Sequence, residues 1–390
     1  ACLEIAGESF FSQADNEWQK KFNQFIDQKS SWLNDYSLFM AIKESQSCAS
    51  WVEWPEPLAN RNPQALEQAR KDFEDKIQQT QFEQFVFFEQ WNDLRAYAET
   101  KNVQLFGDMP FYVSHDSADV WAQREVFLLD STGAATFVAG VPPDIFSETG
   151  QRWGNPLYDW QAMRHNDFCW WVERFRTQLE LFDLLRIDHF RGFEACWHIP
   201  ADEETAINGE WVKTPGTELL QILHDQLTSL PLIAEDLGLI TEEVIELRKA
   251  FSLPGMKILQ FAFDGDSSNP YLPHNHEHDS VVFTGTHDND TTLGWYQGLN
   301  LKDKRSLHDY LGVKLHSILD MPWVMNRMAL SSVSNMCILP MQDVLSLDSS
   351  QRMNMPGTTE GNWCWRFEWH QIWPGLSSDL KTLNGIYCRV

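Results

Sequence analysis

Short apolar runs that recur after residue 100 constrain the fold of this chain more than any other feature. Each run is long enough for one strand, and most of them end in a polar or acidic residue. Such runs are typical of parallel strands that are buried on both faces. Helical stretches separate several of the runs, and this alternation predicts βα repeats in an α/β fold. The six runs lie at residues 103–108, 182–188, 230–235, 256–263, 280–288 and 337–340.

The chain divides into two regions of different character. Residues 1–100 read as a helical insertion subdomain, because apolar residues recur there at helical spacing. Residues 101–390 carry the predicted strands. The interval between the first two runs is too long for one helix, so we expect an inserted loop region at 109–180. The helical subdomain ends in an aromatic stripe that we expect to pack in its core, formed by Phe82, Phe85, Phe88 and Trp91.

Composition excludes several classes of partner and compartment. With 30 Lys and Arg against 56 Asp and Glu, the formal net charge is −26, and so acidic a surface repels nucleic acid and anionic membranes. We recognise neither a membrane-spanning run nor a signal peptide. The seven scattered cysteines favour the reducing cytoplasm over a disulfide scaffold or a zinc module. The 18 tryptophans suit either sugar rings or a core.

Three acidic residues end predicted strands, where parallel α/β folds place their active sites. They are Asp188, Glu235 and Asp288. One interpretation is a metal site with oxygen ligands. Another is glycoside chemistry, in which one carboxylate attacks the sugar and a second serves as acid and then base. A third is a set of surface acids without chemistry, and the strand ends alone leave all three open.

The neighbours of these acids favour the glycoside interpretation. Arg186 lies two positions before Asp188 and therefore shares its face of the strand. An arginine there would keep the carboxylate ionised and aim it, as a nucleophile requires. His287 precedes Asp288 in a polar cluster that suits sugar hydroxyls. Two adjacent acids at 235 and 236 point to opposite faces, so we expect one to face the site and the other to pack away from it.

Other polar segments receive weaker assignments. The Gly- and Pro-rich segment 140–156 reads as a loop over the site, although a plain surface connection is the alternative. Asp108 at the first strand end is expected to support the site or bind substrate. The histidine-rich tract 274–278 precedes a strand, which argues against a metal site there. Segment 354–358 reads as a loop whose function its spacing does not define.

Several of these segments together resemble amylomaltase, the bacterial 4-alpha-glucanotransferase family of the α-amylase clan. The resemblance extends from about residue 32 to residue 363. Its most specific parts are RIDHFRG at 186–192, AEDLG at 234–238, THDNDT at 286–291, and PPD at 142–144 with GQRWGNP at 150–156.

The resemblance implies a (β/α)8 TIM barrel with helical insertions. Six strands are visible here, and they would be strands 3 to 8 of the barrel. Members of the family begin with a further segment that holds the first strand or strands, and we expect that segment to be absent from this chain. No cofactor and no metal ion is implied. The implied partners are α-1,4-glucans and maltooligosaccharides, and the sequence predicts no oligomeric state.

The resemblance also assigns roles to individual residues. It implies Asp188 as nucleophile, Glu235 as acid/base and Asp288 as stabiliser of the transition state. Arg186 and His287 would contact the sugar that is transferred. The remaining substrate-binding candidates would cover the glucan groove from the loop after residue 140, namely Asp144, Phe146, Gln151, Trp153 and Asn155.

The expected activity is transfer of α-1,4-glucan segments between maltooligosaccharides or glucose by a retaining double displacement. Three alternatives remain at this stage. One is a retaining α-glucan hydrolase of the same clan. The second is an inactive or truncated glucan-binding barrel, because the strand count is incomplete. The third is a metal enzyme.

Overall fold

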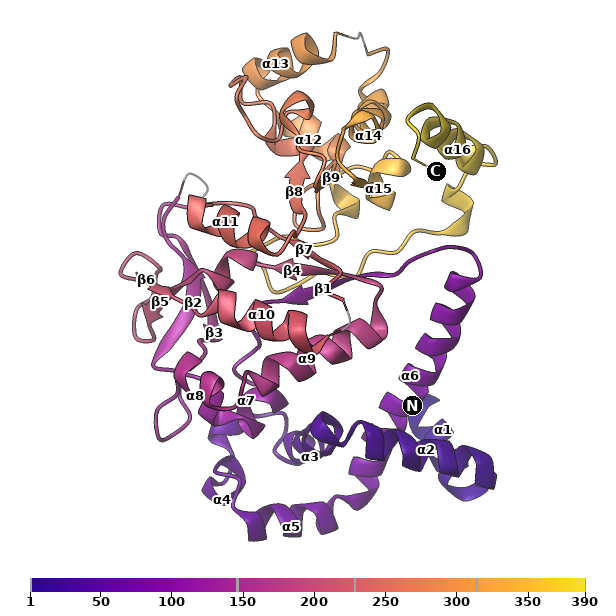
Figure 1. Ribbon diagram of the computed structural model, residues 1–390. Coiled ribbons are helices and arrows are strands. Elements are labelled where there is room, and N and C mark those ends of the chain that lie inside the picture. Colours follow the sequence, from indigo (N-terminus) through magenta and orange to yellow (C-terminus); the bar gives the residue numbers. More distant parts are fainter. Residues whose placement is uncertain (1, 145–146, 228, 313–314, 390) are drawn as a thin grey trace. The chain divides into compact units, whose positions relative to one another are not determined.

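The computed structural model describes residues 2–144, 147–227, 229–312 and 315–389. The chain forms two compact units, which we describe separately. Unit 1 comprises Ala1–Leu232 and Thr241–Leu247, and unit 2 comprises Ile233–Ile240 and Arg248–Val390. Figure 1 labels most of the helices and strands of each unit.

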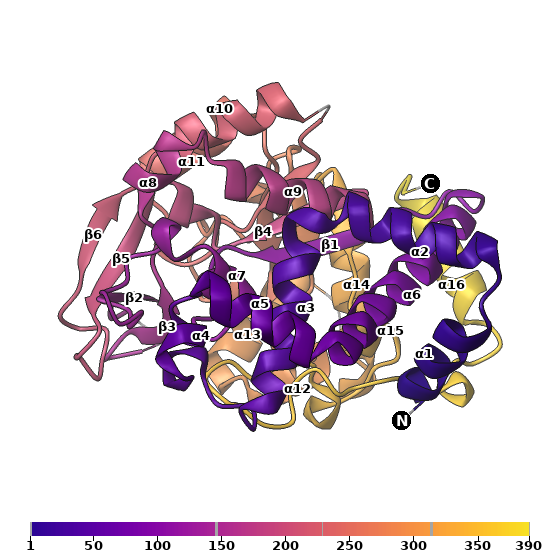
Figure 2. The ribbon, with the colours of Figure 1, turned by 90° about the horizontal axis from the view of Figure 1, so that it is seen from below.

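Unit 1 begins with the helices that the sequence predicts. Two of them start at side-chain caps, since Asp15 accepts hydrogen bonds from the first turn of α2 and Asn62 does so for α5. Helix α6 packs against α1, α2 and α3, and these indigo and purple helices are seen together in Figure 2. The helices are α1 (Cys2–Gln13), α2 (Asn16–Gln28), α3 (Ser30–Ser45), α4 (Glu56–Ala59), α5 (Pro63–Asp72) and α6 (Glu74–Glu99), with a 3-10 turn at Trp51–Glu53.

The predicted aromatic stripe packs in the core of this helical region. Phe82, Phe85 and Phe88 are buried in one cluster with Phe22 and Phe25. Each phenyl ring removed from water contributes on the order of 1.5–3 kcal/mol, so the stripe is a main source of stability here. The fourth member of the stripe is only half-buried, and its indole Nε1 donates to a backbone carbonyl at 2.8 Å.

A parallel sheet carries the first three predicted strands, and the first two of them lie in unit 1. Its order is β1 (Phe106–Pro110), β4 (Leu184–Asp188) and β7 (Leu232–Ala234), and the division between the units falls after Leu232. β1 and β4 pair in parallel register, with Asp108 opposite Arg186. The helices beside these strands in sequence are α9 (Cys169–Leu181), α10 (Gly216–Gln226) and α11 (Glu242–Ala250).

An antiparallel sheet in unit 1 was not predicted. Segment 140–156, expected to be a loop, lies partly in strands, since it contains the end of β2 and all of β3. Gly140 is required there, because a Cβ at this position would lie 2.2 Å from the carbonyl oxygen of Gln151. The sheet order is β3 (Gln151–Pro156), β2 (Phe137–Val141), β5 (Ala195–Pro200) and β6 (Glu210–Lys213), and short helices nearby in sequence are α7 (Ala118–Ala122) and α8 (Trp160–His165), with 3-10 turns at Arg124–Val126 and Phe190–Phe193.

Unit 2 contains the other three predicted strands as a second parallel sheet. The order is β10 (Met336–Ile338), β9 (Ser280–Phe283) and β8 (Gly255–Ile258), with both pairings parallel. Further elements are α12 (Thr292–Gly298), α13 (Leu301–Leu311), α14 (Met321–Ser331), α15 (Met341–Val344) and α16 (Leu376–Ile386), and 3-10 turns at Leu259–Phe261, Pro273–Asn275, Ile318–Asp320, Ser349–Gln351 and Trp369–Gln371.

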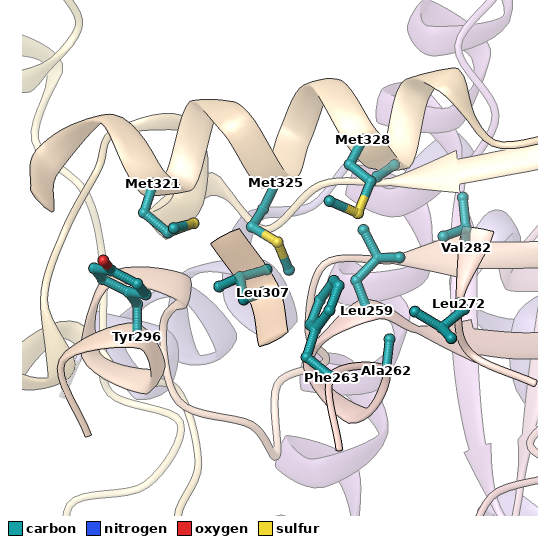
Figure 3. Packing of buried hydrophobic residues seen from close by; sticks show 11 residues of the cluster. Leu259, Ala262, Phe263, Leu272, Val282, Tyr296, Leu307, Met321, Met325 and Met328 are labelled. Atoms are coloured by element: carbon teal, nitrogen blue, oxygen red, sulfur yellow. The ribbon is translucent and has the colours of Figure 1, made fainter. Parts of the chain in front are cut away.

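The core of unit 2 lies between these strands and α14. Figure 3 shows Met321, Met325 and Met328 on the face of α14 that is turned toward this core, with Met321 above Tyr296 and Met328 above Leu259. The unbranched methionine side chains fill the space between the helix and the strand ends. This packing anchors the end of β9, from which the polar segment 284–290 departs.

All six predicted runs overlap a strand of a mixed α/β fold, in the predicted order. Two predicted strands are shorter than expected. β9 ends at Phe283, because the side chain of Asn289 accepts a hydrogen bond from the backbone N–H of Thr286 at 2.8 Å and turns the chain. β8 ends at Ile258, where a 3-10 turn begins. Among the described residues the sheets are open, and they do not close into a barrel. A search of the described helices finds none with the length and apolar character needed to cross a membrane.

Buried His276 of unit 2 gives stability a pH dependence. Its Nε2 lies 2.8 Å from the Tyr271 carbonyl oxygen and its Nδ1 lies 2.7 Å from Ser332 Oγ. Burial lowers the pKa of His276 from 6.5 to about 4. The unfolded state therefore binds more protons between these values, so stability present above pH 6.5 is lost as pH falls toward 4, by about 3 kcal/mol.

We expect His276→Gln to be less stable than wild type at pH 7 but to lose less stability on acidification. Urea unfolding at pH 7 and pH 4.5 measures this difference, which should amount to about 2–3 kcal/mol. Parallel losses in the two proteins would contradict the assignment.

Candidate functional site

The buried guanidinium of Arg186 holds two carboxylates at the ends of neighbouring strands. Its Nη1 lies 2.7 Å from both oxygens of Asp108 on β1, and its Nη2 lies 2.9 Å from Asp188 Oδ1 on β4. The arginine side chain is 8% exposed, whereas that of Asp188 is 43% exposed. Arg186 and Asp188 thus share one face of β4, as their spacing predicts. Charge-assisted hydrogen bonds from an arginine favour the ionised form of a carboxylate and fix its orientation. The exposure of Asp188 leaves this carboxylate open to solvent.

The next residue, His189, has the opposite character. Its backbone is left-handed, with φ 56°. Burial, and secondarily the charge of Arg191, lowers the pKa of His189 to about 3. The ring lies edge-on to Trp153 at 4.9 Å between centroids and also contacts Tyr112 at 5.8 Å. An uncharged histidine therefore links the segment after Asp188 to strand β3.

Three predicted substrate-binding residues lie on β3. The Trp153 side chain is exposed, and its Nε1 donates to Gln151 Oε1 at 3.1 Å. Asn155 donates from Nδ2 to the Val113 carbonyl at 2.9 Å, so its amide has a scaffold contact. Asp144, in the connection before β3, accepts the Ser147 N–H at 2.8 Å. Phe146, also predicted to bind substrate, lies outside the described residues.

In unit 2, the adjacent acids Glu235 and Asp236 have different environments. Asp236 is largely buried, accepts the Met256 N–H at 2.7 Å and pairs with Arg248 at 3.2 Å. Burial raises the pKa of Asp236, although these contacts oppose the shift. Glu235 accepts the backbone N–H of Leu237 at 3.2 Å. Burial, followed by the charges of Asp236 and Glu235, raises the pKa of Tyr271 to about 12.

The third predicted acid, Asp288, lies in the loop after β9. The Nε2 atom of His287 is 3.5 Å from Asp288 Oδ2. The Asp288 backbone N–H donates to Thr286 Oγ1 at 3.3 Å. Both Asp288 and His287 are partly exposed, so they are accessible to a ligand.

A segment that sequence reasoning left unassigned contacts this acid. Asn354 Nδ2 donates to Asp288 Oδ1 at 2.6 Å, and Arg352 Nη2 donates to the Asp288 carbonyl at 2.6 Å. The ring of Trp363 lies 4.9 Å from that of His287. These contacts join residues that are far apart in sequence, and no local sequence pattern would have predicted them.

The histidine-rich tract is held by protein groups. His274 faces the Tyr310 hydroxyl at 3.1 Å, and His276 is buried as described above. Within the part of the chain that the structure describes, no group of three His, Cys, Asp or Glu side chains is arranged to hold a metal ion.

Comparison with known proteins gives consistent matches. A family model described as 4-alpha-glucanotransferase matches residues 1–371. A 4-alpha-glucanotransferase of Synechocystis is 48% identical over 374 residues, which cover 95% of this chain and 74% of the relative. A 4-alpha-glucanotransferase of Thermus thermophilus is 46% identical over 386 residues, which cover 98% and 77%.

Among solved structures, amylomaltase from Streptococcus agalactiae in complex with acarbose matches with a TM-score of 0.95 and 36% identity, over 99% of this chain and 77% of that chain. The chain therefore spans about three quarters of the length of these three relatives.

Because Arg186 contacts both Asp108 and Asp188, we expect substitutions of these two acids to have non-additive effects on stability. Asp108→Asn or Asp188→Asn alone removes one carboxylate contact of the buried guanidinium, whereas the double variant removes two. We expect the loss of unfolding free energy in the double variant to exceed the sum of the single losses by about 1–3 kcal/mol. Urea unfolding of the wild type, the two single variants and the double variant at pH 7 measures these losses. If the two single losses simply add up in the double variant, the three residues do not act as one unit.

Proposed function

The chain belongs to the 4-alpha-glucanotransferase family, and on this premise we propose that Asp188, Glu235 and Asp288 carry its reaction. The activity is transfer of an α-1,4-glucan segment from a donor glucan to an acceptor. We propose a double displacement with retention of the anomeric configuration.

In the first step, Glu235 donates its proton to the glycosidic oxygen while Asp188 attacks the anomeric carbon. The bond from that carbon to the glycosidic oxygen breaks, and a bond to an Asp188 oxygen forms. The donor's reducing-end portion leaves with a new 4-hydroxyl group. The transferred glucan is then covalently attached to Asp188, and Glu235 is ionised.

In the second step, Glu235 takes the proton from the 4-hydroxyl of the acceptor glucan. The acceptor oxygen attacks the same anomeric carbon, and the bond to Asp188 breaks. Two inversions give net retention, and both carboxyl groups return to their starting protonation states. We propose that Asp288 stabilises the positive charge that develops on the sugar in both steps.

The observation that carries this proposal is the contact of Arg186 with Asp188. A nucleophilic carboxylate must be ionised, oriented and accessible. The guanidinium favours the ionised form, its 2.9 Å contact fixes one oxygen, and the 43% exposure leaves the group open to a substrate. Arg186 and His287 are further proposed to contact the transferred sugar.

Transfer requires that water does not intercept the covalent intermediate. We propose that the segment around Trp153 covers the glucan together with Asp144, Phe146, Gln151 and Asn155. The exposed indole offers an apolar face to a sugar ring, and its contact with His189 fixes it. Water excluded by such a cover would leave an acceptor hydroxyl as the available nucleophile.

We also propose that β1, β4, β7, β8, β9 and β10 are successive strands of a (β/α)8 barrel. The near-complete match to the Streptococcus agalactiae amylomaltase supports this assignment.

We further propose the cytoplasm as the compartment, which fits the seven free cysteines. Maltooligosaccharides are the proposed partners, and acarbose in that relative is consistent with them.

Replacement of the proposed nucleophile tests the mechanism. We expect Asp188→Asn to lower kcat for glucosyl transfer from maltotriose at least about 10³-fold. Asp188→Ala supplied with azide should form a glycosyl azide of inverted configuration, because azide enters the vacated position. Asp225→Asn, an exposed carboxylate of α10, is the control and should retain wild-type kcat. A kcat of Asp188→Asn close to that of wild type would refute the assignment of Asp188 as the nucleophile.

Opening the proposed cover tests why transfer prevails over hydrolysis. We expect Trp153→Ala to lower the ratio of glucosyl transfer to hydrolysis about tenfold, because water reaches the intermediate. New reducing ends and longer oligosaccharides from maltotriose measure the two outcomes. Trp18→Ala, an exposed tryptophan of α2, is the matched control. An unchanged ratio in Trp153→Ala would remove this residue from the cover.

A further inference from the structure

The segment 352–363 of unit 2 contacts His287 and Asp288 through three hydrogen bonds and a ring contact of Trp363. Asn354 donates from its side chain to Asp288 Oδ1 at 2.6 Å and from its backbone N–H to the His287 carbonyl at 3.1 Å. Arg352 donates to the Asp288 carbonyl at 2.6 Å. Main chain and side chain of the acid are therefore fixed by the same segment.

The segment is itself a closed loop with internal hydrogen bonds. Asn362 accepts the Met355 N–H at 2.9 Å and donates to the Thr358 carbonyl at 3.0 Å. The Trp363 N–H donates to the Met353 carbonyl at 2.8 Å, which joins the two ends of the loop. Arg352 also donates from Nε to the Asn354 carbonyl at 2.8 Å. These bonds make the loop a scaffold that can hold one side chain in a defined position.

Asp288 needs such a scaffold because its position does not follow from the sheet. β9 ends at Phe283, and the strand ladder does not extend to the acid. The carboxylate is 41% exposed. A short bond to one oxygen restricts rotation of the carboxylate, while the other oxygen lies 3.5 Å from His287 Nε2.

We propose that Asn354 is a positioning residue that orients the carboxylate of Asp288 toward the positive charge of the transition state. The inference rests on the proposed role of Asp288. An amide suits this task because its N–H donates without carrying a charge or losing a proton. A fixed donor means that the carboxylate needs little reorganisation when the charge develops.

A carboxyl group at position 354 would not replace the amide as a hydrogen-bond donor to Asp288. Two carboxylates at this distance cannot both ionise readily, so an aspartate at 354 would compete with Asp288 for a proton. At acid pH the pair could share one proton and keep the hydrogen bond. At neutral pH both carboxylates would be ionised, and their repulsion would move them apart.

We therefore test Asn354→Ala and Asn354→Asp in the full chain with maltotriose as substrate. We expect Asn354→Ala to lower kcat about 10–100-fold with a KM change below about threefold, since a misplaced group costs mainly transition-state stabilisation. Its pH profile should keep the wild-type shape. Asn354→Asp should show an optimum displaced to acid pH. A loop residue that only supported folding would not produce this displacement.

Two controls separate positioning from loss of structure. Met355→Ala changes the neighbouring, half-exposed side chain and should retain wild-type kcat. Urea unfolding should give Asn354→Ala a midpoint close to that of wild type. A kcat of Asn354→Ala within about twofold of wild type, or identical pH profiles for Asn354→Ala and Asn354→Asp, would overturn the inference.

A double-mutant cycle distinguishes this inference from the proposed function. If Asn354 acts through Asp288, Asn354→Ala should cause little further loss in the Asp288→Asn background. Multiplicative losses would show that Asn354 acts by another route and would overturn the inference alone. Wild-type kcat in Asp288→Asn would instead overturn the proposed role of Asp288, whatever the effect at Asn354.

Discussion

The pairing of one buried guanidinium with two carboxylates is the constraint on which unit 1 depends. Burying Arg186 without compensation would cost several kcal/mol, so its strand must lie where acidic partners reach it. The parallel register that sets Asp108 opposite Arg186 meets this requirement. Because Asp188 lies two residues farther along the same face, one cation serves both acids. The interaction that fixes the register of β1 and β4 is therefore also the one that orients the proposed nucleophile.

Unit 2 orients its acid by a different physical device. Asp288 follows a strand that has already ended, so a side chain from a distant loop supplies the hydrogen bond. A neutral amide at this position fixes the carboxylate without cancelling its charge, whereas the cation at Asp188 reduces the charge that the group presents. The difference fits the proposed chemistry, since a stabilising anion must keep its full charge throughout the reaction. A nucleophile must instead become a neutral ester.

Sequence patterns predicted the parts of the structure that depend on short-range periodicity. Alternation along β4 correctly placed Arg186 beside Asp188, and the apolar runs identified the six parallel strands of the described residues. β3 escaped detection because its first three residues are exposed and Gly154 has φ 83°, so it lacks the apolar alternation of a buried strand. The contact of Asn354 with Asp288 depends on how a loop closes, and no periodicity encodes such a contact. The roles assigned to the acids came from the family resemblance and stay predictions.

The environment after Asp188 shows how a protein can keep a carboxylate's surroundings constant over a wide pH range. His189 follows the acid directly, and a histidine there could add a positive charge when protonated. Burial lowers its pKa to about 3, so it is neutral at neutral and mildly acid pH. Arginine keeps its proton at every pH at which the protein is folded. The permanently charged Arg186 thus supplies a constant positive charge beside Asp188, while the neighbouring His189 ring packs against Trp153.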